Sequence, residues 1–320
     1  MKKPDITLAE LLGVDQALSE VAMPPTPAPG SVGASTSMKV GSVGVPTPST
    51  GASATFAVHA DLHSHSTISD GSFTAEELLQ QAADAHITHL AITNHDTTYG
   101  IDAIQRAAVH YPVRYIGGIE ISAYDFKRNR KVHVLGLGVK EQSPAIKELC
   151  DPVLKRRSEN TQWQQERLER CGYVLNTEVL HRLRKASTGF YKQHLMAALT
   201  SAPYTSSAYQ QLYRKLFKGN GICHRDITYV DMGDAVRAIT EDGGVAVLAH
   251  PGQLDSYDAV PELVDAGLWG IEKYHPDHTI DDWHHVDCLA QRYGLACTGG
   301  SDFHGAFGDV PKLGECWISL

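Results

Sequence analysis

The segment DLHSHSTISDG, residues 61–71, decides how the rest of the chain can fold. If residues 58–65 form a strand, alternate side chains point to opposite faces, so His63 and His65 point the same way. Asp70 follows on a Ser-Asp-Gly turn, where its carboxylate can fold back over the two imidazoles. A His-x-His pair is more often held by ordinary hydrogen bonds than by a metal ion. We therefore expect a metal site only if other segments bring further ligands to the same place.

Short apolar runs alternate with helical patterns from residue 56 onward. Further strands are expected at 89–95, 113–120, 131–138, 244–250, 268–272 and 295–302, with helices between most of them. One of these helices begins at a capping box formed by Thr74 and Glu77. Alternating strands and helices are typical of parallel β/α units. The pattern predicts an α/β fold, a seven- or eight-stranded β/α barrel, with an open doubly wound sheet as the alternative.

Four regions follow from this pattern. Residues 1–56 are predicted to be a disordered N-terminal extension, because the tract 24–54 is rich in Pro, Gly, Ser and Thr and lacks aromatic residues. Leucines between positions 8 and 18 allow a short amphipathic helix before that tract. Residues 57–140 and 229–320 are predicted to form the two parts of the barrel. Residues 141–228 are interpreted as an inserted helical cap, with helices at 152–171, 177–185, 191–202 and 206–217.

The composition excludes several classes of protein. The 320 residues carry a formal net charge of −9, which disfavours non-specific binding to duplex DNA. The cap is an exception, because Lys and Arg outnumber Asp and Glu over residues 141–226. No apolar run reaches the roughly 18 residues of a membrane span and no secretory signal is found, so we expect a cytoplasmic protein without membrane contact. The six cysteines include no C-x-x-C pair, which argues against a thiolate zinc site and a disulfide scaffold.

Histidine, aspartate and glutamate side chains, which can bind metal ions, occur at the end of one predicted strand after another. In parallel β/α folds the carboxyl ends of the strands converge on one face, so these side chains are expected to meet there. An apolar core gains nothing from burying imidazoles and carboxylates without partners. Imidazole and carboxylate without thiolate suit Zn, Mn or Fe, and the set fits two or three divalent ions with Glu120 and Asp302 bridging. The predicted ligands are His63, His65, Asp70, His95, Glu120, His133, His250, Asp302 and His304.

Clustered metal ions suggest hydrolysis of a phosphate ester, with a metal-bridged hydroxide attacking phosphorus. The motifs DLHSHSTISDG, ITNHDT, GIEIS, KVHVLGLG, LAHPG and GGSDFHG resemble, in order and context, those of the PHP (polymerase and histidinol phosphatase) family. More narrowly, they look like its cytoplasmic phosphoesterase branch, which acts on nucleotides and short RNA ends. The resemblance covers about residues 57–140 and 229–308. It implies a distorted (β/α)7 barrel and a trinuclear metal centre held by the same set of ligands.

The function expected from these observations is metal-dependent hydrolysis of nucleotide phosphomonoesters, such as nucleoside monophosphates or 3′,5′-bisphosphates. Asp302 is expected to bridge metal ions or to act as general base, with Glu120 and His304 as the other catalytic residues. A 5′–3′ exonuclease acting on short RNA or DNA is the first alternative. A histidinol-phosphate phosphatase and a non-catalytic scaffold are the others.

Four residues are candidates for binding the substrate phosphate. His278 lies in a loop above a strand end and, by the resemblance, matches a position that faces phosphate in relatives. Arg184, Lys192 and His194 lie in the basic cap and could meet an anion above the metals. Where relatives commonly have a Gly-Arg-Pro-His run, this chain has GFYKQH at 189–194. Aromatic residues of the cap, such as Tyr204, could stack a base or form the core of the cap.

Overall fold

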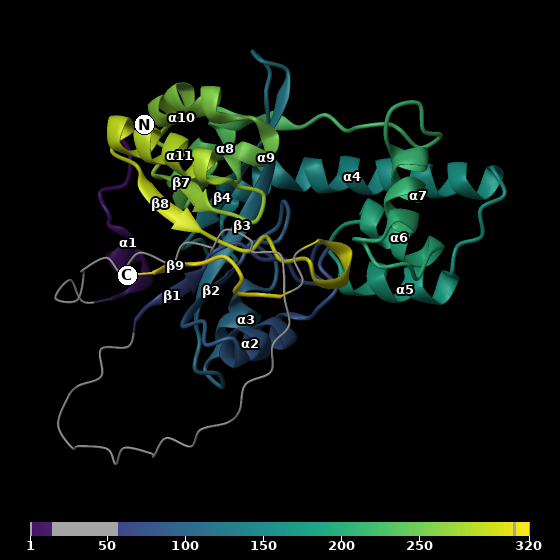
Figure 1. Cartoon of the computed structure of the whole chain (residues 1–320), viewed down its shortest axis with the longest axis horizontal. Coiled ribbons are helices and arrows are strands. Elements are labelled where there is room, and N and C mark those ends of the chain that lie inside the picture. The colour runs from purple at the N-terminus through teal and green to yellow at the C-terminus, as the bar shows by residue number, and fades with distance from the viewer. Residues whose placement is uncertain (1, 15–56, 310–311, 320) are drawn as a thin grey trace, which may run out of the picture.

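The predicted strands form one mixed sheet in a computed structural model, which describes residues 2–14, 57–309 and 312–319 (Figure 1). The order of the strands is β8-β7-β6-β4-β3-β2-β1-β9, and β5 pairs with β3. Their bounds are β1 His59–Asp61, β2 His89–Ile92, β3 Arg114–Asp125, β4 Arg130–Leu137, β5 Val230–Asp231, β6 Val245–Leu248, β7 Gly270–Tyr274, β8 Ala296–Gly299 and β9 Ile318–Ser319.

The sheet curls until the segments that follow β1 and β8 meet. Residues just after β1 pair with residues just after β8 through a parallel bridge between Ser64 and Phe303. The Asp302 N–H donates to the His63 carbonyl at 2.8 Å, and the Leu62 N–H donates to the Gly299 carbonyl at 3.0 Å. The prediction of a barrel is therefore confirmed, in the form of a nearly closed mixed α/β barrel rather than an open sheet.

The direction of β4 differs from the prediction of parallel units. β4 runs antiparallel to both neighbours, β3 and β6. Only residues 126–129 separate β3 from β4, and a parallel return needs a crossover of about a dozen residues, so the two strands form a hairpin. Reversal does not change which side chains of a strand share a face, and Leu135 and Leu137 lie together in the barrel interior.

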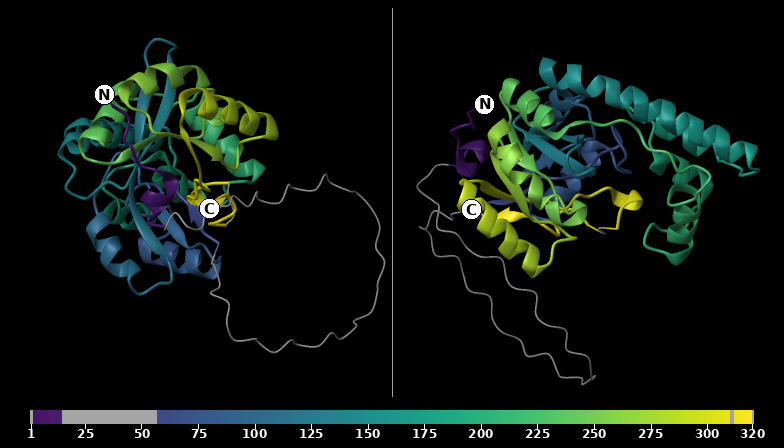
Figure 2. Two further views of the ribbon diagram at one scale, coloured as in Figure 1. Left: turned by 90° about the vertical axis from the view of Figure 1, so that its left-hand side faces the viewer. Right: turned by 90° about the horizontal axis from the view of Figure 1, so that it is seen from above.

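Two apolar layers follow from the strand alternation. One lies inside the barrel and includes Leu62, Leu135, Val247 and Trp269. The other lies between the sheet and an outer set of helices, which surround the strands in Figures 1 and 2. These helices are α2 Ala75–Asp84, α3 Ile101–Ala108, α8 Met232–Glu241, α10 Val260–Ala266 and α11 Ile280–Tyr293, with the short α9 Pro251–Leu254 beside them. The predicted capping box of Thr74 and Glu77 is present at the start of α2.

The cap consists of four helices, α4 Pro144–Arg170, α5 Thr177–Ala186, α6 Lys192–Leu199 and α7 Ser207–Phe217. The prediction that the first of them begins at Pro152 was wrong, because Asp242 caps an earlier start by accepting the Ile146 N–H at 2.8 Å. Cys150 packs in the outer barrel core, whereas Leu168 packs in the separate core of the cap. The long helix α4 thus carries the cap away from the barrel, as Figures 1 and 2 show.

Part of the predicted disordered extension packs against the barrel. Residues 2–14 include α1, Leu8–Leu12, which begins at a capping box of Thr7 and Glu10. Leu12 is fully buried in the barrel interior, and Trp269 Nε1 donates to the Ile6 carbonyl at 2.6 Å. The short amphipathic helix expected among these leucines is therefore present, whereas the prediction of a disordered extension does not hold for residues 2–14, which close the barrel at the strand starts (Figure 2, left). Residues 15–56 lie outside the described part of the chain. No described helix has the length and apolar character that crossing a membrane requires.

Candidate metal centre

All nine predicted ligands lie together on the face of the barrel where the parallel strands end, and His133 reaches it from the amino-terminal half of the antiparallel strand β4. They form three overlapping groups, and within each group one ligand atom per residue lies within 4.8 Å of the others. The groups are His65, Asp70, His95 and His304; His63, His65, Glu120 and Asp302; and Glu120, His133 and His250. Strand ends at one face of a barrel bring distant positions together, so the fold accounts for this convergence.

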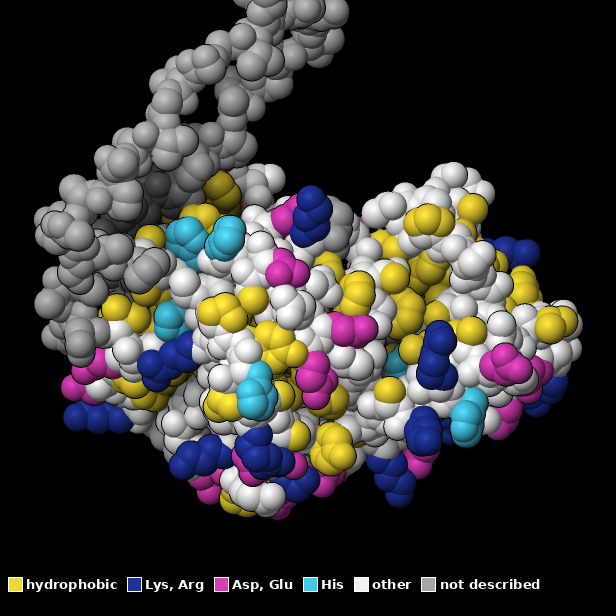
Figure 3. Space-filling view, turned by 90° about the horizontal axis from the view of Figure 1, so that it is seen from below, with side chains coloured by type: hydrophobic (Ala, Val, Ile, Leu, Met, Phe, Trp, Pro, Cys, Tyr) yellow, Lys and Arg dark blue, Asp and Glu magenta, His cyan; other side chains and the backbone are white. Residues whose placement is uncertain are grey.

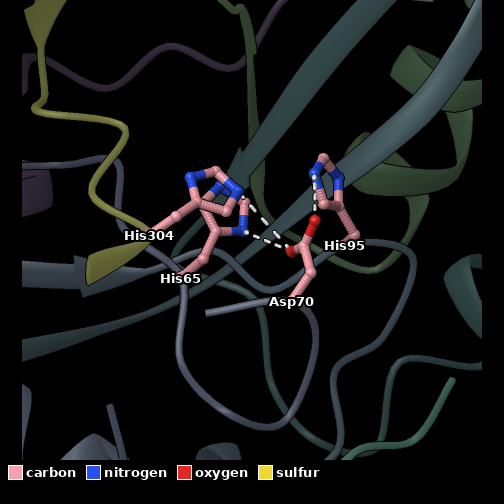
Figure 4. Close-up of side chains that lie close together, drawn as sticks. All are labelled: His65, Asp70, His95 and His304. Atoms are coloured by element: carbon pink, nitrogen blue, oxygen red, sulfur yellow. Dashed lines mark ion pairs between the residues drawn. The ribbon is translucent and has the colours of Figure 1, made fainter. Parts of the chain in front are cut away.

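Asp70 joins two sides of the first group. In Figure 4 its carboxylate points between His65 and His304 on one side and His95 on the other. Asp70 Oδ1 lies 3.5 Å from His304 Nε2, and Asp70 Oδ2 lies 3.9 Å from His95 Nε2. The turn that carries Asp70 depends on Gly71, because a Cβ there would come within 2.2 Å of the His65 carbonyl oxygen. The Ser-Asp-Gly motif is therefore needed to fold the carboxylate back over the strand.

Glu120 lies at the centre of the histidines. Its Oε1 lies 2.7 Å from His133 Nδ1 and 3.0 Å from His250 Nε2. Its Oε2 lies 3.1 Å from His95 Nδ1 and 3.2 Å from His65 Nε2. Burial disfavours charge on this carboxylate, but His95 and the other imidazoles outweigh burial and hold the pKa of Glu120 well below its usual range. One ionised carboxylate thus serves two of the three groups.

The donor atoms of these residues fit divalent cations. Buried side-chain atoms without a hydrogen-bond partner include His63 Nε2, His65 Nε2, Glu120 Oε2 and Asp302 Oδ1, which converge on one another. A buried polar atom without a hydrogen-bond partner lowers the stability of the fold, and metal ions would give these four atoms a partner. Donors that are all imidazole nitrogen or carboxylate oxygen suit Zn, Mn or Fe. The clusters are consistent with several ions, and none of the predicted ligands lies elsewhere.

Backbone conformation at the strand ends is unusual. His250 and Asp302 have φ values of 24° and 49°, and Asp96, beside His95, has 56°. Non-glycine residues rarely take such values, and they persist where surrounding structure holds them for a functional purpose. Gly300 allows the closest approach, because a Cβ at this position would lie 2.3 Å from the His63 Cβ. The GGSD motif therefore brings Asp302 against the first strand.

Glu272, the last residue of the expected strand 268–272, was not among the predicted site residues but takes part in the site. It is fully buried, and its Oε1 lies 3.2 Å from His63 Nδ1 while its Oε2 accepts the His250 N–H at 2.7 Å. Burial is again outweighed by the adjoining imidazoles, chiefly His63, so the pKa of Glu272 lies below its usual range. A carboxylate that holds the outer nitrogen of a ligand histidine fixes its orientation and tautomer. Its place at the end of a strand was the signal available in the sequence.

The residues predicted to bind substrate differ in whether they line the cavity. Lys192 faces a cavity beside His95 and His133. His278 does not, because its Nδ1 contacts the Lys273 carbonyl at 2.9 Å and its Nε2 accepts the Gly252 N–H at 3.1 Å. Both ring nitrogens of His278 are therefore engaged by backbone groups and do not face the cavity.

Two further predictions about the cap disagree with the structure. His194 is 1% exposed, contacts the rings of Phe190 and Tyr191, and hydrogen-bonds the Ser69 backbone beside Asp70, so it is buried where the cap meets the barrel and does not line the cavity. Arg184 stacks over Phe190 and lines a separate depression formed by α4 and α5. Amphipathicity alone could not tell which polar positions of a cap helix face the barrel.

The cavity above the metal-type residues has two connected parts. One part, of about 290 Å³, includes His250, Asp302 and His304 on its floor and Tyr204, Tyr209, Tyr213 and Phe307 among its walls. The other part, of about 340 Å³, shares His95, His133 and Tyr213 with the first and is lined by several Lys and Arg residues. Seen from below, the surface is hollowed where the barrel and the cap meet (Figure 3). Both parts of the protein therefore contribute to the site.

Removing metal ions should lower the thermal stability of the protein. Ligand at 100 times its Kd stabilises a folded state by about 2.7 kcal/mol, which corresponds to a shift of roughly 5–10 °C in Tm. We expect a shift of this size between samples in Mn²⁺ and in a chelator, measured by thermal denaturation. Asp302→Ala should show a smaller shift because it lacks one ligand. Equal Tm values for the wild type in both buffers would contradict the assignment of a metal centre.

Comparisons with known proteins agree with this geometry. The model of the PHP domain matches residues 61–235. Phosphoribosyl 1,2-cyclic phosphate 1,2-diphosphodiesterase from Eggerthella lenta is 59% identical over 256 residues, which cover 79% of this chain and 97% of that protein. The 3′,5′-nucleoside bisphosphate phosphatase from Chromobacterium violaceum is 30% identical over 249 residues, 76% of this chain and 86% of that protein.

A solved structure shows the same fold. A protein from Bifidobacterium adolescentis, provisionally assigned as a metal-dependent phosphoesterase, superposes with a TM-score of 0.72 at 25% identity. The superposition covers 81% of this chain and 91% of the other. The family match covers more than half of the chain, and the first of the relatives above is aligned over nearly its whole length. This chain therefore belongs to the PHP domain family and is a metal-dependent phosphoesterase of that family.

Proposed function

We propose that this protein hydrolyses a cyclic phosphodiester of a phosphorylated ribose. The observation that carries the proposal is the convergence of the nine predicted ligands beside a cavity of small-molecule size, in a chain 59% identical to an enzyme named for phosphoribosyl 1,2-cyclic phosphate. The sequence led us to expect nucleotide phosphomonoesters instead. The broader prediction of a metal-dependent phosphoesterase stands, and the proposal differs only in the ester that is cleaved.

The residues of the site have separable tasks in this reaction. Divalent cations held by the nine residues would lower the pKa of a bound water and stabilise negative charge on the phosphoryl oxygens. Asp302 reaches the cavity, and neighbouring histidines, His63 first, overcome burial and hold its pKa well below its usual range. Asp302 is thus ionised at neutral pH and can accept the proton of the attacking water. Glu272 holds His63 and the backbone of His250 in place.

A nucleoside bisphosphate is the second candidate substrate. The relative from Chromobacterium violaceum is named for such a substrate. The cavity walls include Tyr204, Tyr209, Tyr213 and Phe307, which offer aromatic faces on which a base could stack. The two candidates share a ribose and two phosphates, and they differ in whether the reacting group is a cyclic diester or a monoester.

The proposal is tested by comparing substrates with Mn²⁺ present. We expect phosphoribosyl 1,2-cyclic phosphate to give a higher kcat/KM than nucleoside 3′,5′-bisphosphates and 5′-phosphorylated oligonucleotides. Asp302→Ala should lower kcat for the preferred substrate by about 1000-fold or more, because it removes both a ligand and the proton acceptor. A preference for bisphosphates would replace the proposed function by the second candidate. Wild-type turnover by Asp302→Ala would contradict the mechanism.

A further inference from the structure

A cluster of cations lies beside the metal centre and has no part in holding metal. It consists of Lys131, Arg157, Lys192 and Lys218, which we call the basic arm. Lys131 lies on β4, Arg157 on α4, Lys192 at the start of α6 and Lys218 directly after α7. All four line the cavity part of about 340 Å³ that also includes His95 and His133 of the metal centre. Four elements, three of them from the cap, thus contribute one cation each to the same wall.

Only some of this positive charge is neutralised by the protein. Lys131 pairs with Asp226 at 2.7 Å, and Arg157 pairs with Asp96 at 2.7 Å. Among the residues that the structure describes, no carboxylate lies within 4.0 Å of the ammonium groups of Lys192 or Lys218. The Lys218 ammonium instead lies 5.8 Å from the centre of the Tyr213 ring. Two cations therefore remain available for an anionic group in the cavity.

The neighbouring cations affect the pKa of Lys192. Burial, together with repulsion from Lys131, Arg157 and Lys218, lowers the pKa of Lys192 to about 8 against a weaker attraction from Asp226. A bound anion would relieve that repulsion and replace the lost hydration. Lys192 is therefore held in a position that is unfavourable until an anion arrives.

We propose that the basic arm binds the phosphate monoester of the substrate that is not hydrolysed, while the metal centre holds the reacting phosphate. The inference rests on the proposed function, because the substrate named there has a second phosphate on the same ribose. His95, His133 and Tyr213 line both cavity parts, so the two adjoin at these residues and a small ligand at the metal centre lies next to the basic arm. The cap, which supplies three of the four cations, would thus select substrates that carry the second phosphate.

Binding of ribose 5-phosphate to the metal-loaded protein, measured by titration calorimetry, tests the proposal. We expect Lys192→Ala to weaken binding by about tenfold or more and Lys218→Ala by several-fold, because Lys218 is exposed and its charge is screened. Lys215→Ala is the matched control: Lys215 lies on α7, is exposed and does not line the cavity. Ribose should bind weakly to every variant.

The pH dependence adds an independent readout. Lys192 is charged below about pH 8 and neutral above it, so the affinity of the wild type for ribose 5-phosphate should fall as the pH rises through about 8. Lys131, Arg157, Lys218 and Asp226 are the charged groups that face Lys192. The Lys192→Ala variant should lose this dependence. Equal pH profiles for the two proteins would count against a role for Lys192.

Turnover separates failure of this inference from failure of the proposed function. With ribose 1,2-cyclic phosphate, which lacks the second phosphate, Lys192→Ala and Lys218→Ala should match the wild type. With the phosphorylated substrate their KM should rise. Hydrolysis of both cyclic esters with unchanged binding of ribose 5-phosphate to the variants would overturn the basic arm alone. Binding that depends on the lysines, without turnover of either cyclic ester, would overturn the proposed function and leave the arm.

Discussion

Glu120→Gln should lower kcat by about 1000-fold or more and remove at least one metal ion per chain, because Glu120 belongs to two of the three ligand groups. Glutamine has nearly the same shape but no charge, and its amide group would donate where the carboxylate accepts. The imidazoles of His133 and His250 lie 2.7 and 3.0 Å from one oxygen of Glu120. Loss of that oxygen's charge therefore weakens one group directly and the adjoining group through the second oxygen.

Measurements of metal content and of steady-state rates on the same preparations test this prediction. The matched control is Glu262→Gln, since Glu262 pairs with Lys127 and Arg128 near the surface, away from the metal-type residues. This control should keep the metal content and the rate of the wild type. Circular dichroism would show that both variants are folded. Retention of metal and rate by Glu120→Gln would mean that Glu120 is a structural residue only.

Arg157→Met should lower the free energy of unfolding by about 3–5 kcal/mol, because it leaves a buried carboxylate without its cation. Arg157 Nη2 lies 2.7 Å from Asp96 Oδ2 and donates to Ser122 Oγ at 2.7 Å, and Asp96 is 1% exposed. Asp96 in turn accepts the Ser122 N–H at 2.8 Å and donates its own N–H to the Glu120 carbonyl at 2.9 Å. One cation from α4 thus joins the cap to the strand ends that carry His95 and Glu120.

Urea denaturation of a short series distinguishes the ion pair from general damage to α4. Arg156→Met is the control, because the Arg156 side chain donates to the Thr228 carbonyl at an exposed position. This variant should lower the free energy of unfolding by less than about 1 kcal/mol. Adding Asp96→Asn to Arg157→Met should restore part of the stability, since the double variant no longer buries an unpaired charge. A loss below about 1 kcal/mol for Arg157→Met would show that Asp96 does not depend on Arg157.

The sequence determined the metal-type residues because their positions follow from local rules. Side chains alternate along a strand, so HSH at 63–65 places two imidazoles on one face, and strand ends meet at one side of a barrel. The structure brings all nine together, including His133 from a strand whose direction was predicted incorrectly. His133 reaches the other eight residues because the reversed direction of β4 brings its amino-terminal half beside the carboxyl ends of the parallel strands, while the alternation of its side chains is unchanged.

Only the tertiary structure decided the features that depend on how separate elements pack. The sequence position of His278 predicted contact with the substrate phosphate, but its two ring nitrogens contact the Lys273 carbonyl and the Gly252 N–H instead. The basic arm joins one barrel strand to three cap helices, and no spacing rule relates those positions. The leucines of residues 2–14 indicated a helix, but only the barrel interior that buries Leu12 shows what this helix packs against. Strand periodicity is local and can be read along the chain, whereas each of these contacts depends on a partner distant in the sequence.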